Sequence, residues 1–275
     1  MRIRLGIGVD VWRGGGIDPE AQAFLTAAGI TDPTISNAIN RLVLNYKGQG
    51  NLNTSVDLWT GSKAIYPFVG GTANSHKFNL KDPRDLDAAF RLAFSGGWTH
   101  DANGAKPNGT NAYAQTFLVP SSVLSVNNHA ASYYSGTNLS EPSADPINLG
   151  AFNSITQAIT LSKPNATLNS RLNSTINTVA NTVMKGFNHT TKTSASVSKL
   201  YQNGVAVSTG VGGGTLPTVE IYLGTLNLIG TAYVSGYVRN DFRFCAVSSN
   251  SVSDANALLM YQIVQQFQTD LSRQV

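Results

Sequence analysis

The sequence predicts a domain dominated by β-strands, folded as a sandwich or barrel, with a short helical hairpin before it and a helix at its end. Three observations support this prediction. From residue 60 onward, short apolar segments are separated by Gly, Asn, Pro and Ser at the spacing typical of all-β proteins. Charged residues make up 12% of the chain, about half of the usual share of roughly 25%. Asn203-Gly204 separates two apolar runs, which is typical of a tight β-hairpin.

Residues 1–16 form an N-terminal arm, in which apolar residues occupy alternate positions before a run of three glycines. This alternation predicts a strand. Two interpretations stay open: a frayed terminus, or an assembly arm that pairs with a neighbouring subunit. In the second interpretation, the contacting side chains are Ile3, Leu5, Ile7, Val9 and Trp12.

Residues 17–59 are a predicted helical lead-in. Asp-Pro-Glu at residues 18–20 supplies an N-cap and a proline at the first helical position, and Gly29 is the expected stop. Asp-Pro at residues 32–33 repeats the start signal. Apolar residues at helical spacing follow both signals, so we expect a hairpin of two helices whose apolar face belongs to the core.

Residues 60–275 form the predicted β domain, which ends in a helix capped by Ser253 and Asp254. Residues 167–188 have a pattern that fits helix or strand, and their Thr and Asn content favours strand. The other predicted strands are residues 63–70, 87–94, 112–119, 129–136, 154–161, 198–207, 219–226 and 233–247.

An ordered set of motifs in this domain resembles the C-terminal half of concanavalin A-like (laminin-G-like) jelly rolls. A Y-x-N-G hairpin at residues 201–204 precedes an I-x-L-G strand at 221–224. An aromatic-small-Gly strand follows at 233–236, and an S-x-x-D-A segment at 251–255 opens the last helix. The resemblance implies a two-sheet jelly-roll sandwich.

Earlier segments extend the resemblance to bacteriophage tail and virion proteins that carry this domain. They are AIYPFVGGTANSHKFNLKDP at residues 64–83 and FSGGWTHDANGAKPNGTNAYAQTFLVP at residues 94–120, behind a helical lead-in at 18–34. The resemblance implies a non-enzymatic structural component of the virion, a tail fibre or capsid decoration. Its expected partners are other virion proteins and further copies of itself, and its expected location is the virion.

A carbohydrate-binding adhesion module, attached to host-surface glycans, is the alternative. Sugar recognition needs aromatic rings beside amides and acids, and Trp98, His100, Asp101 and Asn103 lie close together in the sequence. The oxygen atoms of Asp101, Asn103 and Asn108 also suit a hard cation such as Ca²⁺, although the same pattern is typical of an ordinary turn. No other cofactor is expected.

The second alternative is a surface-polysaccharide depolymerase. Glycoside hydrolases of this fold place carboxylates on alternate residues of one strand, but Glu20, Glu141 and Glu220 lie far apart. The four histidines show no metal-binding spacing. A lyase would have to use Tyr133, Tyr134 and His129, which packing on a strand explains better. The sequence therefore predicts no catalytic residues and no enzyme.

Composition excludes other classes of protein. Lys and Arg are scattered and the net charge is only +4, so nucleic-acid binding is not expected. No segment reaches the ~18 apolar residues of a membrane span. The N-terminus has no continuous apolar core of a signal peptide, so we expect release by another route, such as a particle freed by lysis. Cys245 is the only cysteine and is predicted to be buried.

Overall fold

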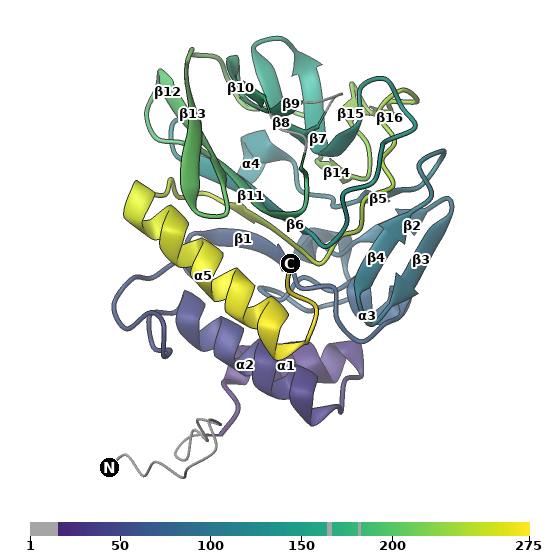
Figure 1. Cartoon of the computed structure of the whole chain (residues 1–275), viewed down its shortest axis with the longest axis vertical. Helices are drawn as coiled ribbons and strands as arrows, with labels where there is room; N and C mark the ends of the chain where they lie inside the picture. Colours follow the sequence, from purple (N-terminus) through teal and green to yellow (C-terminus); the bar gives the residue numbers. More distant parts are fainter. Residues whose placement is uncertain (1–15, 164–166, 181–182) are drawn as a thin grey trace.

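A computed structural model describes residues 16–163, 167–180 and 183–275 of the chain. Two β-sheets face each other, and helices cover the outer side of one of them (Figure 1). The predicted assembly residues of the arm lie outside the described residues; these are Ile3, Leu5, Ile7, Val9 and Trp12.

The first sheet is antiparallel throughout and has six strands in the described residues. Their spatial order is β1 (Ser62–Tyr66), β17 (Phe244–Ser248), β6 (His129–Ser135), β11 (Gly186–Lys192), β12 (Val197–Gln202) and β13 (Val205–Val211).

The second sheet lies opposite the first, and a small hairpin, β3 (Trp98–Asp101) with β4 (Gly104–Pro107), stands apart from both. The main path of the second sheet is β10 (Thr175–Ala180), β9 (Thr167–Leu172), β8 (Gln157–Ser162), β7 (Ile147–Ser154), β14 (Tyr222–Leu223), β5 (Tyr113–Gln115) and β2 (Ala93–Ser95). Beside it lie β15 (Asn227–Leu228) and β16 (Thr231–Ala232). Short helical turns are α3 (Ala73–His76), η1 (Asp87–Ala89) and α4 (Pro120–Val123).

The first sheet is buried on both faces, as the alternation along β17 shows. Cys245 and Val247 point into the core between the two sheets, whereas Phe244 and Ala246 point into a second core beneath the helices. Cys245 is thus buried, as the sequence predicts, and burial raises the pKa of its thiol. A buried thiol of this kind acts as a small apolar side chain.

A layer of helices supplies the other side of the second core (Figure 1). These helices are α1 (Pro19–Ala28), α2 (Pro33–Tyr46) and α5 (Asp254–Asp270). Each begins where the sequence predicts, because the side chains of Asp18, Asp32 and Ser253 accept backbone N–H groups of the first turn. The lead-in helices and the last helix therefore cover the same sheet.

The end of the chain is fixed by a buried arginine. The Arg273 guanidinium donates to the carbonyl oxygens of Pro67 and Phe68 at 2.8 and 2.7 Å. It also donates to Oε1 of Gln268 in α5 at 2.7 Å. These hydrogen bonds tie the end of α5 to the segment that follows β1.

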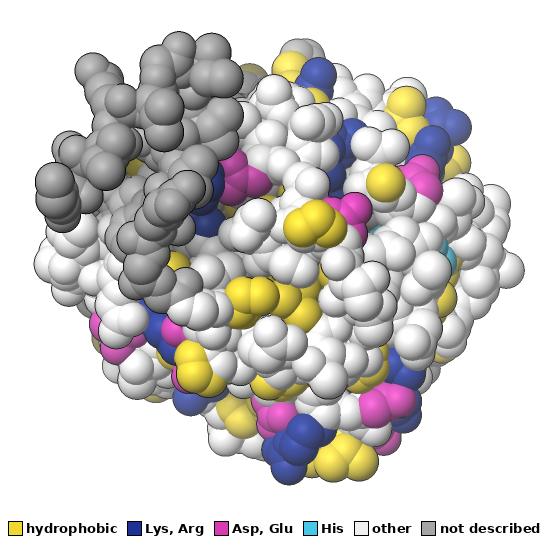
Figure 2. Space-filling model, turned by 90° about the horizontal axis from the view of Figure 1, so that it is seen from below, with side chains coloured by type: hydrophobic (Ala, Val, Ile, Leu, Met, Phe, Trp, Pro, Cys, Tyr) yellow, Lys and Arg dark blue, Asp and Glu magenta, His cyan; other side chains and the backbone are white. Residues whose placement is uncertain are grey.

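The surface is poor in charge, as the composition indicates. Seen from below, most of it is neutral and polar, with isolated charges and small apolar areas between them (Figure 2).

The predicted fold class is confirmed: the chain is β-dominated, with two helices first and one helix last. The Asn-Gly segment forms the hairpin β12–β13, and residues 167–188 contain strands β9 and β10 and the start of β11. Strand β7 was not predicted, although it lies at the centre of the second sheet.

Two predicted strands are largely wrong. In residues 87–94, η1 and the positive φ of 59° at Phe90 turn the chain before β2 begins. In residues 233–247, only the end pairs as a strand. Side-chain oxygens of Glu141 and Thr137 accept the N–H groups of Arg239 and Asp241, at 2.6 and 3.0 Å, where a neighbouring strand would otherwise be needed.

The hairpin turn yields a stability prediction. Asn203 and Gly204 have φ of 50° and 79°, and a Cβ on Gly204 would lie 2.9 Å from Cα of Leu258 in α5. We expect Gly204→Ala to lower the free energy of unfolding by about 1–3 kcal/mol, because both the backbone conformation and the contact with α5 become strained. Urea denaturation measures this loss.

Gly213→Ala is the matched control, because a Cβ there meets no atom within 4 Å. It should change the free energy of unfolding by less than about 1 kcal/mol. Equal losses in the two variants would contradict the packing of the hairpin against α5.

Candidate functional site

The hairpin β3–β4 carries the residues that the sequence suggested for sugar binding, but Trp98 is used for packing. Its indole N–H donates to the carbonyl oxygens of Ser95 and Tyr113 at 3.0 and 3.1 Å. Its ring contacts Phe94 and Phe242, with centroids 5.2 and 5.8 Å away. Trp98 therefore supports the neighbouring strands, and its polar atom is already occupied.

His100 is also turned toward the protein. Its Nδ1 lies 2.9 Å from Nδ1 of His76 in α3, so the N–H of one ring donates a hydrogen bond to the other ring. His76 is buried, and desolvation together with the His100 charge lowers its pKa to about 3. Burial also lowers the pKa of His100. Both rings are therefore neutral at pH 7.

Asp101, Asn103 and Asn108 do not converge on one point. Asp101 accepts the N–H of Asn103 at 2.7 Å, which is the hydrogen bond of an ordinary turn. Asp101 lies opposite Gly104 at one end of the hairpin, whereas Asn108 follows Pro107 at the other end. With a strand rise of about 3.3 Å per residue, these ends lie roughly 10 Å apart.

The described part of the chain contains no cluster of three or more His, Cys, Asp or Glu side chains that suits a metal ion. The three oxygen-bearing residues above would have to supply ligands over a distance that one Ca²⁺ ion, with ligand distances of about 2.3–2.6 Å, does not span. The structure therefore does not bring together the metal ligands that the sequence suggested.

A different group of side chains lies on the outward face of the second sheet. Ala114 and Leu223 point into the core between the sheets, so their neighbours Tyr113, Gln115 and Tyr222 point outward. Tyr222 lies directly across from Gln115 in the strand register. The rings of Tyr113 and Tyr222 have centroids 5.0 Å apart and planes inclined by 33°.

Glu220 adds a carboxylate to these side chains. One carboxylate oxygen accepts the backbone N–H of Phe117 at 2.5 Å, and the other accepts Nε2 of Gln115 at 3.2 Å. Glu220 is half-buried, and this desolvation raises its pKa despite the two hydrogen bonds. We call this group the tyrosine patch; it consists of Tyr113, Gln115, Glu220 and Tyr222.

Small neighbours leave the tyrosine patch open at its edge. Ala93 and Ser95 of the edge strand β2 lie across from Gln115 and Tyr113, so the patch is open on that side. Across from Tyr222, the side chain of Leu226 fills the space above Gly150. Tyr222 is itself only 5% exposed, whereas Tyr113 is partly exposed. The accessible ring is therefore that of Tyr113, with Tyr222 holding it in place.

Chemically, the tyrosine patch combines an aromatic face with an amide and a carboxylate. An aromatic ring offers apolar area at low entropic cost. An amide both donates and accepts hydrogen bonds, and a carboxylate only accepts them. Such a surface suits a neutral ligand that has both C–H faces and hydroxyl groups.

The sequence carries a local signal for the tyrosine patch. In AYAQ at residues 112–115 and EIYL at residues 220–223, aromatic or polar residues alternate with small or aliphatic ones. This period of two places Tyr113 and Gln115 on one face. What the sequence does not reveal is that the two segments, about a hundred residues apart, are neighbours in one sheet.

The residues considered for a lyase lie in the interior. Tyr133, Tyr134 and His129 are all fully buried in β6. The hydroxyl of Tyr133 donates to the carbonyl of Asp241 at 2.6 Å, and that of Tyr134 donates to Oε1 of Gln265 at 2.8 Å. Nδ1 of His129 lies 2.8 Å from the carbonyl oxygen of Ser125. These side chains are therefore part of the interior and are not exposed to a polymer.

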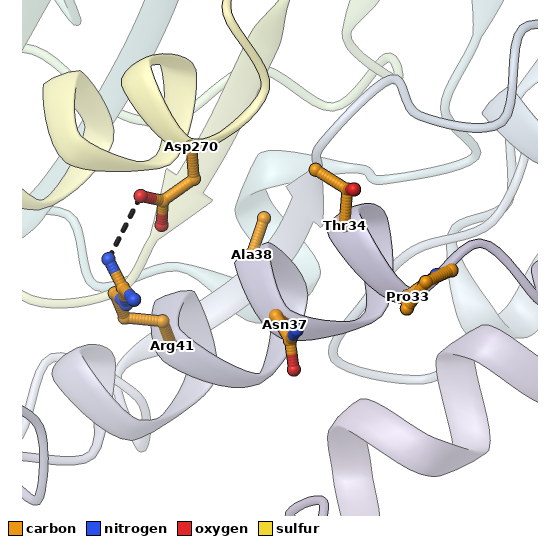
Figure 3. A pocket seen from close by; sticks show the side chains of 6 residues that line it. All are labelled: Pro33, Thr34, Asn37, Ala38, Arg41 and Asp270. Atoms are coloured by element: carbon orange, nitrogen blue, oxygen red, sulfur yellow. Dashed lines mark hydrogen bonds and ion pairs between the residues drawn. The ribbon is translucent and has the colours of Figure 1, made fainter. Parts of the chain in front are cut away.

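An open hollow of about 360 Å³ lies between α2 and α5 (Figure 3). It is lined by Pro33, Thr34, Asn37, Ala38, Arg41 and Asp270. Its charged side chains already pair with each other, with Nη1 of Arg41 2.9 Å from Oδ1 of Asp270. The lining includes no aromatic side chain, so the hollow lacks the anchor that most ligand sites use.

No family model matches the chain, and no curated protein matches it in sequence. Solved structures do match. The receptor-binding domain of a botulinum neurotoxin of the C/D mosaic serotype is 11% identical, with a TM-score of 0.50, over 74% of this chain and 51% of that one. Domain 4 of an arabinanase from Geobacillus stearothermophilus, solved with arabinotriose, is 13% identical, with a TM-score of 0.47, over 74% and 98%.

A sialidase from Streptococcus pneumoniae is 11% identical, with a TM-score of 0.41, over 59% of this chain and 27% of that one. The chain thus spans about a quarter of the sialidase and about half of the toxin domain. At these identities the likeness concerns the fold alone, and it agrees with a two-sheet sandwich. None of the helices in the described residues combines the length and the hydropathy needed to cross a membrane.

The buried histidines yield a pH prediction. Desolvation lowers the pKa of His189 to about 3 and that of His129 to about 4, as it does for His76. Between pH 6.5 and 4 the unfolded chain therefore binds protons that the folded chain does not. We expect the free energy of unfolding to fall as the pH falls through this range, by on the order of 1 kcal/mol per pH unit for each histidine.

Urea denaturation at pH 7 and at pH 5 checks this slope. Burial raises the pKa of Glu141 and Glu220, so the folded chain binds protons at these groups before the unfolded chain does. Their contribution to the free energy of unfolding therefore rises as the pH falls, opposite to that of the histidines. His189→Asn should make the slope shallower whatever it does to stability at pH 7. A free energy of unfolding that stays constant or rises toward pH 5 would contradict the buried, neutral state of these rings.

Proposed function

We propose that this chain is a non-enzymatic carbohydrate-binding module that attaches to surface glycans through the tyrosine patch. The observation that carries the proposal is the pair of rings of Tyr113 and Tyr222, 5.0 Å apart, beside the amide of Gln115 and the carboxylate of Glu220. A sugar ring would stack on Tyr113, and its hydroxyl groups would bond to Gln115 and Glu220.

The location of the tyrosine patch supports this proposal. The helices cover the outer face of the six-stranded sheet, and the inner faces of both sheets form the core. On the outward face of the second sheet, Leu226 covers the middle at Gly150, and the part beside the edge strand β2 remains for a ligand. The surface around the tyrosine patch belongs to a chain with only 12% charged residues. A neutral, hydrogen-bonding surface of this kind suits a glycan better than it suits a highly charged ligand.

The absence of catalysis is part of the proposal. Glycosidases flank the scissile bond with two carboxyl groups. Asp87 is the charged group whose proximity further raises the pKa of Glu220, but it is paired with Nε of Arg91 at 2.8 Å. An ion-paired, exposed carboxylate on an open patch does not supply the second catalytic group. Incubation with glycans that bind should therefore release no product.

The setting that we propose for this module is a bacteriophage virion, where it serves host attachment or assembly together with other virion proteins. The motif resemblance and the low charge of the chain support this setting. Mass spectrometry of purified particles tests it. Finding this chain among the particle proteins is the expected result, and its absence from intact particles would rule the setting out.

Substitutions in the tyrosine patch test glycan binding. On the best ligand from a glycan array, we expect Tyr113→Ala to raise the Kd about tenfold, because the stacking surface is lost. We expect Glu220→Gln to raise it about three- to tenfold, because a hydrogen bond to a charged group is replaced by a neutral one. Calorimetric titration measures both values.

Tyr261→Ala is the matched control, since Tyr261 lies on α5, on the opposite side of the sandwich, and is also partly buried. It should leave the Kd unchanged. Equal effects of Tyr113→Ala and Tyr261→Ala, or no binding to any glycan by the folded wild-type protein, would overturn the proposal.

A further inference from the structure

Strand β13 is an edge strand that no other described strand covers, with a register shift in its pairing with β12 at Val207. Among the described strands it pairs with β12 alone and is the last strand of the six-stranded sheet. Its seven residues, VAVSTGV, include no charged residue and no proline. Val205 and Val211 are 62% and 79% exposed. Natural proteins usually protect such an edge with charges, proline or a covering segment, because its free N–H and C=O groups attract another strand.

The opposite edge of the same sheet is covered, which makes the contrast informative. Beside β1, the side chain of Asn79 accepts the N–H of Ile65 at 2.9 Å and donates to the carbonyl of Lys63 at 3.1 Å. The N–H of Leu80 donates to the carbonyl of Ile65 at 2.8 Å. The chain thus satisfies one edge by its own atoms and leaves the other for a partner.

The far end of β13 is held firmly in place. The fully buried Lys192 donates from Nζ to Oγ1 of Thr175 in β10 at 2.9 Å and to the carbonyl of Gly212 at 2.6 Å. At the other end, Gly204 contacts α5. The edge is thus fixed at both ends, and the residues after the register shift at Val207 are already extended, so binding loses little entropy there.

The N-terminal arm has the sequence that such an edge accepts. Residues 3–9 number seven, as β13 does, and place Ile or Leu or Val at every second position. An extended segment that adds to a sheet edge gains main-chain hydrogen bonds and places alternate side chains on one face of the sheet. With residues 3–9 paired, residues 10–15 form the linker, which reaches at most about 20 Å when extended, so the two molecules must be in contact.

We propose that residues 3–9 of one copy add as a strand to β13 of a neighbouring copy, so that the chain assembles by arm exchange. The neighbouring copy is favoured over the same copy because α1 lies at the bottom of the molecule in Figure 1 and α2 and α5 lie between it and β13, farther than the short linker spans. The contact is independent of glycan binding, and it would place several tyrosine patches on one particle, which strengthens attachment by avidity.

Two variants of the full-length protein test the arm exchange by light scattering. Deletion of residues 1–15 removes the donor, and the double variant Val205→Lys/Val211→Lys blocks the acceptor with charges at exposed positions. We expect an oligomeric wild type, and we expect both variants to be monomeric at concentrations at least tenfold above its dissociation midpoint. Circular dichroism shows whether each variant is folded.

The matched control is Ile155→Lys/Ile229→Lys, which adds the same charge at exposed apolar residues outside the edge. It should assemble as the wild type does. The decisive sample is a mixture of the two monomeric variants, since one retains the arm and the other retains the edge. A heterodimer in that mixture is the expected result.

A monomeric wild type, an unchanged oligomer after deletion of the arm, or a mixture that stays monomeric would each overturn arm exchange. An arm that protects β13 in a monomeric wild type, as measured by hydrogen exchange, would also overturn it, because the arm would then occupy its own edge. Glycan binding by the monomeric variants is measured separately, so a failure here is distinguishable from a failure of the tyrosine patch.

Discussion

The six-stranded sheet must be covered on both faces, and the rest of the structure depends on this constraint. Tyr133 and Tyr134 are successive residues of β6, and both are fully buried, one in the core between the sheets and the other beneath the helices. A β-sandwich alone would leave Tyr134 and Phe244 in water. The helices α1, α2 and α5 are therefore part of the domain's core, and Arg273 fixes the last of them to the sheet.

The same constraint decides where a ligand can bind. Once the helices and the inter-sheet core have used both faces of the first sheet, the outward face of the second sheet beside β2 is left for recognition. There Tyr113, Gln115, Glu220 and Tyr222 meet from two neighbouring strands. Their hydrogen bonds and ring contact fix the side chains before a ligand arrives, which limits the entropy that binding costs. The assembly edge at β13 belongs to the other sheet, so the two surfaces do not compete.

The sequence predicts the elements that local signals determine. The caps at Asp18, Asp32 and Ser253 and the turn at Asn203-Gly204 are local, and the structure has each of them. The irregular segment before β17 was mistaken for a strand, because its partners are side chains about a hundred residues away. For the same reason, the hairpin with Trp98 stood out in the sequence, whereas the tyrosine patch depends on a pairing of β5 with β14 that no local pattern encodes.

A map of the amide groups that a bound oligosaccharide protects from hydrogen exchange tests the central claim most directly. The account predicts slower exchange at residues 113–117 and 220–223, including the Phe117 N–H that Glu220 accepts, and no change in α2 or α5. Protection confined to the hairpin at residues 98–103, or to the hollow between α2 and α5, would place the ligand elsewhere and contradict binding at the tyrosine patch.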